Sequence, residues 1–352
     1  MKFDFVIGNP PYQEELDNTS DRPIYNDFID AAYAIGRIVE LITPARFLFN
    51  AGKTPKEWNE KMLNDKHFKV LLCEMDSKKV FSNTEIKGGV AIHYHDISKD
   101  FGKIGIYTIY DELNKILHKV QLNNQKSLSS IIYSAENYKF SDKIYKENPE
   151  ILKMTTFDAK GRKVPLISKG HEYDLVSNIF DKLVNIAFFE KKPNNNEYMQ
   201  IYGRFKNDRY YMYIQKDYIE NDNNINCFKV FVPKANGSGI FGEVLSTPVV
   251  GKPNEGYTQT FISIGNFQSR YEAESTLKYI KSKFCRCMLS ILKVTQINQR
   301  PTWKYVPLQD FTSKSDIDWS KSIKEIDKQL YKKYKLSKEE IEFIESKVKE
   351  ME

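Results

Sequence analysis

The sequence is poor in cysteine, with four in 352 residues. This count excludes a disulfide-stapled scaffold and is typical of a reducing cytoplasm. No run of about 18 apolar residues occurs, so we expect no membrane span. The segment from Met1 to Asp4 leads directly into an apolar strand, without the features of a signal peptide. The formal net charge is only +6, which does not by itself indicate a nucleic-acid partner.

The amino-acid usage is that of a globular protein, with 41% hydrophobic and 28% charged residues. Over the first 124 residues, strand and helix patterns alternate, which predicts an α/β sheet with helical crossovers. The predicted strands are 3–7, 38–42, 68–74, 90–94 and 104–109, and the predicted helices are 24–35, 55–64 and 113–120.

The pattern changes after residue 124, where short strands lie among loops rich in Asn, Gly and Pro. Strands are predicted at 210–214, 228–232 and 260–264, and apolar spacing over 273–291 predicts one long helix. The final segment reads as two helices, the second beginning at a capping box of Ser337 and Glu340. The predicted parts are therefore 1–124, a mixed α/β region over 125–320, and C-terminal helices over 321–352.

The tetrapeptide Asn9-Pro10-Pro11-Tyr12 directly follows the first predicted strand. The exocyclic amine of a nucleobase is a poor nucleophile because its lone pair is delocalised into the ring. The carboxamide oxygen of Asn9 and the carbonyl oxygen of Pro10 can accept its two hydrogens, which frees the lone pair. Two prolines fix the backbone in advance. A base in a duplex must be flipped out to reach such a site, and the Tyr12 ring can replace its lost stacking.

With this tetrapeptide, the sequence resembles the gamma class of adenine-specific DNA methyltransferases of restriction-modification systems. Residues 42–48 resemble the family segment that borders the cofactor and the base, and Phe81, within 80–92, is the aromatic candidate for the flipped-base pocket. Further supportive resemblances lie at 302–307, 318–320 and 330–345. The resemblance implies a partial Rossmann-like methyltransferase sheet, a target-recognition domain, and methyl transfer from S-adenosylmethionine to adenine in double-stranded DNA.

The sequence departs from the family in one respect. The family's glycine-rich cofactor loop, its ribose-binding acid and three strands precede the tetrapeptide, and no such segment precedes Asn9 here. The cofactor-binding residues are therefore unknown, and we expect a partner polypeptide to carry the cofactor lobe; a truncated gene product is the alternative. Gly237 to Gly242 matches G-x-G-x-x-G, but no helix pattern follows it, so a flexible glycine loop is favoured.

Basic residues interleaved with aromatics at 202–211 suit phosphate contact and base stacking. An ordinary charged hairpin explains the same pattern. The segment from Thr295 to Arg300 is a second candidate, because Gln, Asn and Arg can contact base edges in the major groove, and Ser168 to His171 is a weaker third. The predicted DNA-binding residues are Arg204, Lys206, Arg209, Gln296, Asn298 and Arg300.

Two other patterns favour different chemistry. Asp76 with Glu85 and Lys87 imitates a magnesium-dependent nuclease, although these residues fall within the methylase-like segment. His93 and His95 lie on one face of a strand but lack further metal ligands. We therefore expect no metal site. The rival to an enzyme is a non-catalytic DNA-binding specificity or regulatory subunit, which would have no need of Asn9.

Overall fold

The computed structural model describes residues 3–14, 22–82, 86, 88–123, 126–158, 160–220, 224–293 and 295–351. The fold is α/β, as predicted. The chain forms two compact units, Met1–Asn114 and Lys115–Glu352. The predicted boundary at 124 and 125 lies outside the described residues and stays a prediction.

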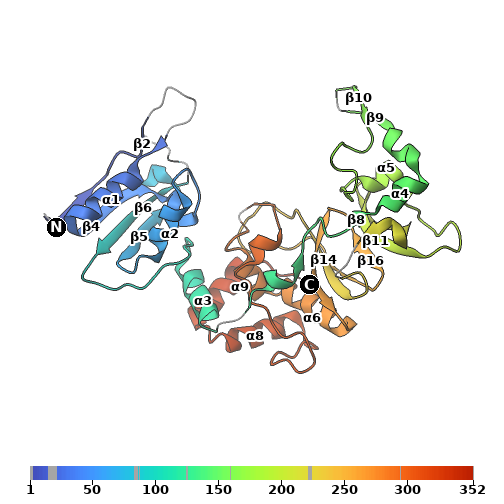
Figure 1. Ribbon diagram of the computed structural model, residues 1–352. Coiled ribbons are helices and arrows are strands. Elements are labelled where there is room, and N and C mark those ends of the chain that lie inside the picture. The colour runs from blue at the N-terminus through green and yellow to red at the C-terminus, as the bar shows by residue number, and fades with distance from the viewer. Residues whose placement is uncertain are drawn as a thin grey trace. The chain divides into compact units, whose positions relative to one another are not determined.

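The first unit contains a four-stranded sheet in the order β1-β4-β6-β5 (Figure 1). β1 pairs parallel to β4, whereas β6 runs antiparallel to both β4 and β5. β1, β4 and β5 therefore point the same way, and their carboxyl ends lie at one edge of the sheet. The strands are β1 (Phe3–Gly8), β4 (Gly36–Pro44), β5 (Phe68–Glu74) and β6 (Val90–Asp96), with a separate hairpin of β2 (Gln13–Glu14) and β3 (Arg22–Pro23).

Helix α1 (Tyr25–Ile35) joins β1 to β4 as a parallel crossover. Gly36 ends the helix and begins the strand, where a Cβ would stand 2.8 Å from Val6 Cγ2. The core of this unit fills the space between one face of the sheet, α1 and α2 (Lys56–Asn64). Its fully buried residues include Ile29, Val39, Ala45, Phe47, Phe68 and Ala91.

The other face of β1 is apolar and exposed. Val6 packs against the core, so by strand alternation Phe3, Phe5 and Ile7 point to the opposite face. Their exposed fractions are 56%, 61% and 75%. Among the described residues β1 pairs with β4 alone. β1 therefore presents both an open edge and an exposed apolar row, over which the Arg37 guanidinium lies 5.9 Å from the centre of the Phe5 ring.

The predicted strand over 104–109 is wrong. These residues form a loop, in which Gly105 adopts a φ of +65° and its N–H donates to Leu63 O at 2.7 Å. The left-handed glycine breaks the extended pattern that the apolar residues suggested. The helix expected next is present as α3 (Asp111–Leu122), which crosses the boundary between the units.

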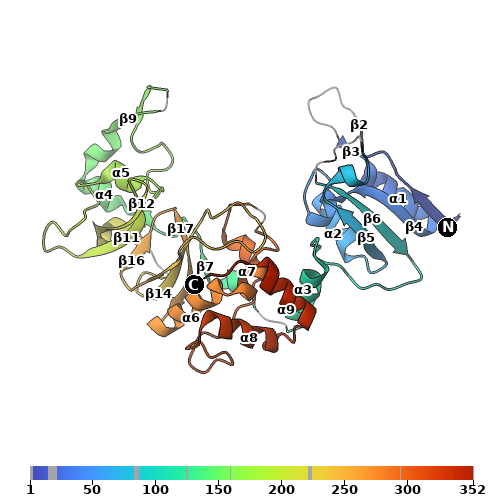
Figure 2. The same cartoon turned by 180° about the vertical axis from the view of Figure 1, so that it is seen from behind.

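The second unit combines small sheets with helices (Figure 2). One sheet has the order β12-β11-β16, with β12 antiparallel and β16 parallel to β11; another is the antiparallel sheet β15-β14-β17-β7. The strands are β7 (Ile132–Tyr133), β8 (Lys139–Phe140), β9 (Thr155–Phe157), β10 (Lys163–Pro165), β11 (Tyr198–Phe205), β12 (Asp208–Gln215), β13 (Ile219–Glu220), β14 (Phe228–Pro233), β15 (Val249–Gly251), β16 (Glu255–Tyr257) and β17 (Phe261–Phe267). The helices are α4 (Asp142–Glu147), α5 (Ile179–Leu183), α6 (Arg270–Lys281), α7 (Lys283–Leu289), α8 (Ile323–Lys333) and α9 (Lys338–Lys347).

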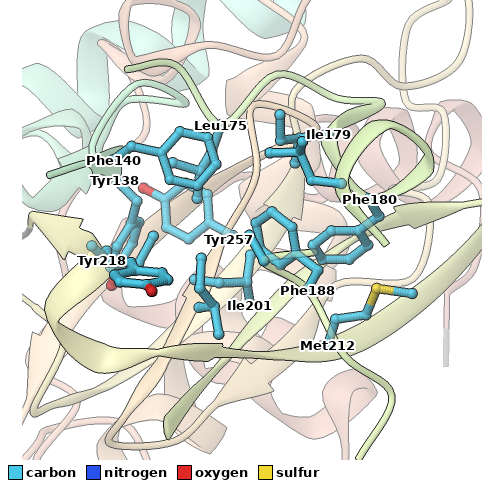
Figure 3. Close-up of a cluster of buried hydrophobic side chains, with 14 of the residues drawn as sticks. Tyr138, Phe140, Leu175, Ile179, Phe180, Phe188, Ile201, Met212, Tyr218 and Tyr257 are labelled. Atoms are coloured by element: carbon cyan, nitrogen blue, oxygen red, sulfur yellow. The ribbon is translucent and has the colours of Figure 1, made fainter. Parts of the chain in front are cut away.

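Aromatic side chains dominate one core of this unit (Figure 3). Tyr138 and Tyr257 meet edge to face with ring centroids 4.9 Å apart, and Phe180 meets Phe188 at 4.8 Å. Burial of such large side chains stabilises this unit by the hydrophobic effect. The core connects β11, β12 and α5, so it fixes where the hairpin and its neighbouring loops stand.

The single long helix predicted over 273–291 is instead two helices. Ser282 takes an extended conformation, with ψ of 149°, and its hydroxyl accepts the Cys285 N–H at the start of α7. Asp327 of α8 accepts the N–H groups of Lys283 and Phe284, so tertiary capping stabilises the break. The capping box of Ser337 and Glu340 is present at α9. No helix in the described segments has the length and apolarity needed to cross a bilayer.

Candidate functional site

The tetrapeptide 9–12 is anchored at both ends. On one side, Gly8 pairs in register with Leu41 of β4. On the other, the Ile24 N–H donates to the Tyr12 carbonyl oxygen at 3.2 Å, directly before α1. Asn9 between these anchors is exposed. The fold therefore presents the Asn9 carboxamide to solvent on a backbone that two prolines and two anchors hold.

Topology brings three predicted segments to one edge of the sheet. Asn9 follows β1, Arg46 follows β4, and Phe81 follows β5, and these three strands point the same way. In open α/β sheets, ligands bind beyond the carboxyl ends of the strands. Phe81 is half-buried, and its N–H donates to Ser77 O at 2.8 Å. The edge thus carries an amide, a guanidinium and an aromatic ring.

Arg46 connects the loop after β4 to the loop before β6. A Cβ at Gly88 would stand 2.6 Å from Arg46 Cγ, and Gly88 has a φ of +89°, so this position requires glycine. The Ala45 N–H also donates to Gly89 O at 3.0 Å. Arg46 therefore packs against Gly88, just before β6.

Tyr12 differs from a freely exposed stacking ring. Its side chain is half-buried against the core of the first unit. Its hydroxyl is buried and has no hydrogen-bond partner in the described part of the chain, and burial raises its pKa to about 12. Tyr12 is therefore an uncharged ring held in place by packing, with part of its surface accessible.

His93 and His95 behave as core residues. His93 lies against Phe68, with ring centroids 5.4 Å apart, and burial lowers its pKa to about 3. His95 stacks on Tyr33 at 3.9 Å. No group of three or more potential metal ligands gathers in the segments that the structure describes. His93 Nε2 also lies 3.2 Å from Thr43 Oγ1, and His95 Nε2 lies 3.2 Å from Asp65 Oδ2, so both imidazoles have partners within the core.

Of the nuclease pattern, Asp76 lies among the described residues. Asp76 is exposed, and its carboxylate accepts the Lys78 N–H at 3.2 Å as a local cap. Glu85 and Lys87, the other members of the pattern, lie outside the described residues.

The backbone amides of the glycine loop 237–242 bind a carboxylate of the protein itself, that of Glu243. Glu243 accepts the N–H groups of Ser238 at 2.9 Å and Gly239 at 3.1 Å, and the Lys293 ammonium also donates to it. A Cβ at Gly237 would stand 2.1 Å from Glu243 Oε2. Burial opposes ionisation of Glu243, but the hydrogen bonds from Lys293 and the two amides outweigh it and lower its pKa. These donors are therefore occupied, and the loop does not fit a cofactor phosphate or ribose.

Replacing Glu243 by alanine is expected to destabilise the protein by about 3 kcal/mol, because it leaves the Lys293 ammonium buried without its counter-ion. The Lys293 side chain is only 3% exposed. Denaturant unfolding measures the change. Glu342→Ala removes the carboxylate of an exposed pair with Lys338 and is expected to leave the midpoint unchanged. Equal midpoints for both variants would contradict a structural role for Glu243.

The hairpin predicted around Arg204 and Arg209 is present. Lys206 and Asn207, with φ of +50° and +72°, form its two-residue turn between β11 and β12. Arg204 is exposed and pairs in register with Arg209. Arg209 donates to Thr247 O at 2.8 Å and Ser246 O at 3.1 Å, so its guanidinium is held against the loop before β15. The hairpin tip therefore carries three cations, one of them anchored.

The second predicted DNA segment is only partly available. Asn298 is fully buried, and its amide donates to Pro233 O at 3.3 Å, so the expected contact of Asn298 with base edges is corrected. Its backbone N–H pairs with Lys234 O beside β14, which draws the side chain inward. Gln296 and Arg300 are exposed, although Arg300 Nε donates to Ser129 O at 2.9 Å.

Known proteins resemble parts of this chain. Residues 1–81 match the family model of the Eco57I restriction-modification methylases. An uncharacterized adenine-specific methylase of Mycoplasma pneumoniae is 31% identical over 141 residues, which cover 36% of this chain and 33% of that protein. The chain thus spans about a third of the length of this curated relative.

Among solved structures, the type IIG restriction endonuclease BpuSI aligns with 87% of this chain and 44% of its own, at 8% identity and a TM-score of 0.31. A likeness this loose supports no conclusion about this chain. The sequence matches carry more weight, because one of them includes the tetrapeptide and the strand before it. Residues 1–81 match the Eco57I restriction-modification methylase family, which confirms the predicted resemblance to adenine-specific methylases of restriction-modification systems.

Proposed function

We propose that the chain is the catalytic and DNA-recognition part of a gamma-class adenine-specific DNA methyltransferase, in which a second polypeptide supplies the cofactor lobe. The observation that carries the proposal is the exposed Asn9 carboxamide at the carboxyl edge of the sheet, between two backbone anchors. The reaction class is transfer of a methyl group to the N6 amine of an adenine that has been flipped out of the duplex.

The residues of the tetrapeptide hold the amine. Asn9 Oδ1 and the Pro10 carbonyl oxygen accept its two hydrogens, which localises the nitrogen lone pair for attack. Pro11 restricts the backbone, so these acceptors need little reorganisation. The accessible part of the Tyr12 ring stacks on the base, and Phe81 contributes a second aromatic surface from the loop after β5. S-adenosylmethionine supplies the methyl group when it is bound to the cofactor lobe.

The second unit binds the duplex. Arg204 and Lys206 at the hairpin tip contact phosphates, and Arg209, held by two carbonyl groups, supports them. Gln296 and Arg300 are exposed and extend the contact surface. Phosphate contacts position a protein on DNA, and they make its affinity depend on salt.

The exposed edge and face of β1 support the proposal of a partner polypeptide. An exposed edge strand with an apolar row on one face is a template for association. Phe3, Phe5 and Ile7 form such a row, and β1 has a free edge among the described residues. A cofactor lobe that adds a strand beside β1 and covers this row would bring its methyl donor to the edge that carries Asn9.

Calorimetric titration with S-adenosylmethionine tests the division of labour. We expect no binding to the chain alone, and binding to its complex with a second polypeptide that carries a glycine-rich cofactor loop. Tight binding to the isolated chain would overturn the proposed partner, because it would place the cofactor site on this polypeptide.

A further inference from the structure

A pocket of about 360 Å³ lies in the second unit, beside α5. Its size is within the range of pockets that take small ligand groups. The residues that line it come from four separate segments of the chain and include Ser168 and His171, from the weakest of the sequence candidates. The residues lining it are Glu136, Ile167, Ser168, His171, Asp174, Val176, Lys182 and Gln259.

Most charges around this pocket are already paired. Glu136 accepts a hydrogen bond from Lys234 at 3.1 Å, and Asp174 lies 2.8 Å from His171 Nδ1. Lys182 is different, because no carboxylate lies within 4.0 Å of its ammonium in the described part of the chain. Burial also lowers the pKa of Lys182. The pocket therefore offers a ligand one half-buried, uncompensated donor.

The pocket adjoins the cationic hairpin. Asp181, the neighbour of Lys182 on α5, accepts the N–H of Lys206 in the hairpin turn at 3.0 Å. A Cβ at Gly203 of β11 would stand 2.6 Å from the Phe180 ring of α5, so helix and hairpin are in close contact. Lys182 is therefore next in sequence to a residue that contacts the hairpin turn, whose cations the proposed function assigns to phosphates.

We propose that this pocket reads a guanine of the DNA target through Lys182, with the Gln259 amide beside it; this inference rests on the proposed function. Guanine presents two acceptors, O6 and N7, in the major groove, and a Lys or Arg donor is their usual partner. Adenine presents one acceptor, N7, beside an amine donor, cytosine presents a donor, and thymine presents one acceptor with a methyl group, so only guanine offers an ammonium two acceptors. The paired carboxylates leave Lys182 to face the base.

Selection from a pool of duplexes with randomised positions tests this proposal on the full chain. Wild type is expected to enrich guanine at one position or more. Lys182→Met is expected to lose the enrichment at one guanine position by about tenfold or more, while preferences elsewhere remain. Lys182→Arg keeps a donor for O6 and N7 and is expected to retain that preference. Lys206→Met, in the hairpin turn, is expected to weaken all sequences alike and to reduce the salt dependence.

Unchanged guanine enrichment in Lys182→Met would overturn the proposal. An equal loss of enrichment at every position would also overturn it, because that result would mean that Lys182 contacts a phosphate or stabilises the fold. If wild type binds duplex DNA but enriches guanine at no position, the proposal of guanine readout fails and the proposed DNA binding stands. If wild type binds no duplex at all, the proposed function of the second unit fails as well. Thermal unfolding of each variant separates a loss of structure from a loss of contact.

Discussion

Asn9→Ala is expected to reduce adenine methylation by about a thousandfold in the complete enzyme, because one of the two acceptors for the amine is lost. Asn9 is exposed, so the variant is expected to fold as wild type does. Initial rates of methyl incorporation into duplex DNA, measured with the chain and its cofactor-lobe partner, give the comparison.

Asn64→Ala provides the matched control. Asn64 is an exposed amide in the same unit, at the end of α2, and its side chain donates to Glu60 O of its own helix. Its rate is expected to equal that of wild type. Comparable rates for Asn9→Ala and wild type would remove the tetrapeptide from the mechanism.

Phe5→Asp is expected to weaken association with the cofactor-lobe polypeptide by about a thousandfold, because it places a charge in the centre of the apolar row on β1. Phe5 is 61% exposed, so folding of the chain alone is expected to change little. Calorimetry or sedimentation of the mixed polypeptides measures the affinity.

Leu71→Asp is the control for the β1 interface. Leu71 is 46% exposed but lies on β5, at the opposite edge of the same sheet. Three strand spacings, about 14 Å, separate the two edges. Its affinity for the partner is expected to match that of wild type, and equal losses in both variants would show that β1 is not the docking strand.

Local patterns predicted the strand and the helix that flank the tetrapeptide better than they predicted the loops and helix ends elsewhere in the chain. The strand before Asn9 follows from a short apolar run that ends in turn residues, and the crossover helix after it follows from the helical spacing of its apolar residues. The loop at 104–109 has the same apolar content as a strand, and only the backbone of Gly105 distinguishes it. Periodicity also runs unbroken through Ser282, where a cap from Asp327 on another helix stabilises the break.

Long-range contacts decided the remaining candidates. Gly237 to Gly242 matches a cofactor fingerprint. Yet Lys293, far along the chain, donates to Glu243, whose carboxylate occupies the backbone amides of this loop. Asn298 suits base contact by residue type, but its pairing with Lys234 buries it. Lys182 carried no sequence signal, because its neighbours Ser168 and Gln259 meet it only in the fold. No local pattern reports which donors tertiary structure has already used.

The central claim is tested most directly by identifying the methylated nucleoside. Duplex DNA would be incubated with S-adenosylmethionine, the chain and its cofactor-lobe partner, digested to nucleosides, and analysed by mass spectrometry. The account predicts N6-methyladenine when both polypeptides are present, and none with either alone or with Asn9→Ala. Absence of N6-methyladenine in every combination would contradict the account and favour a non-catalytic DNA-binding subunit.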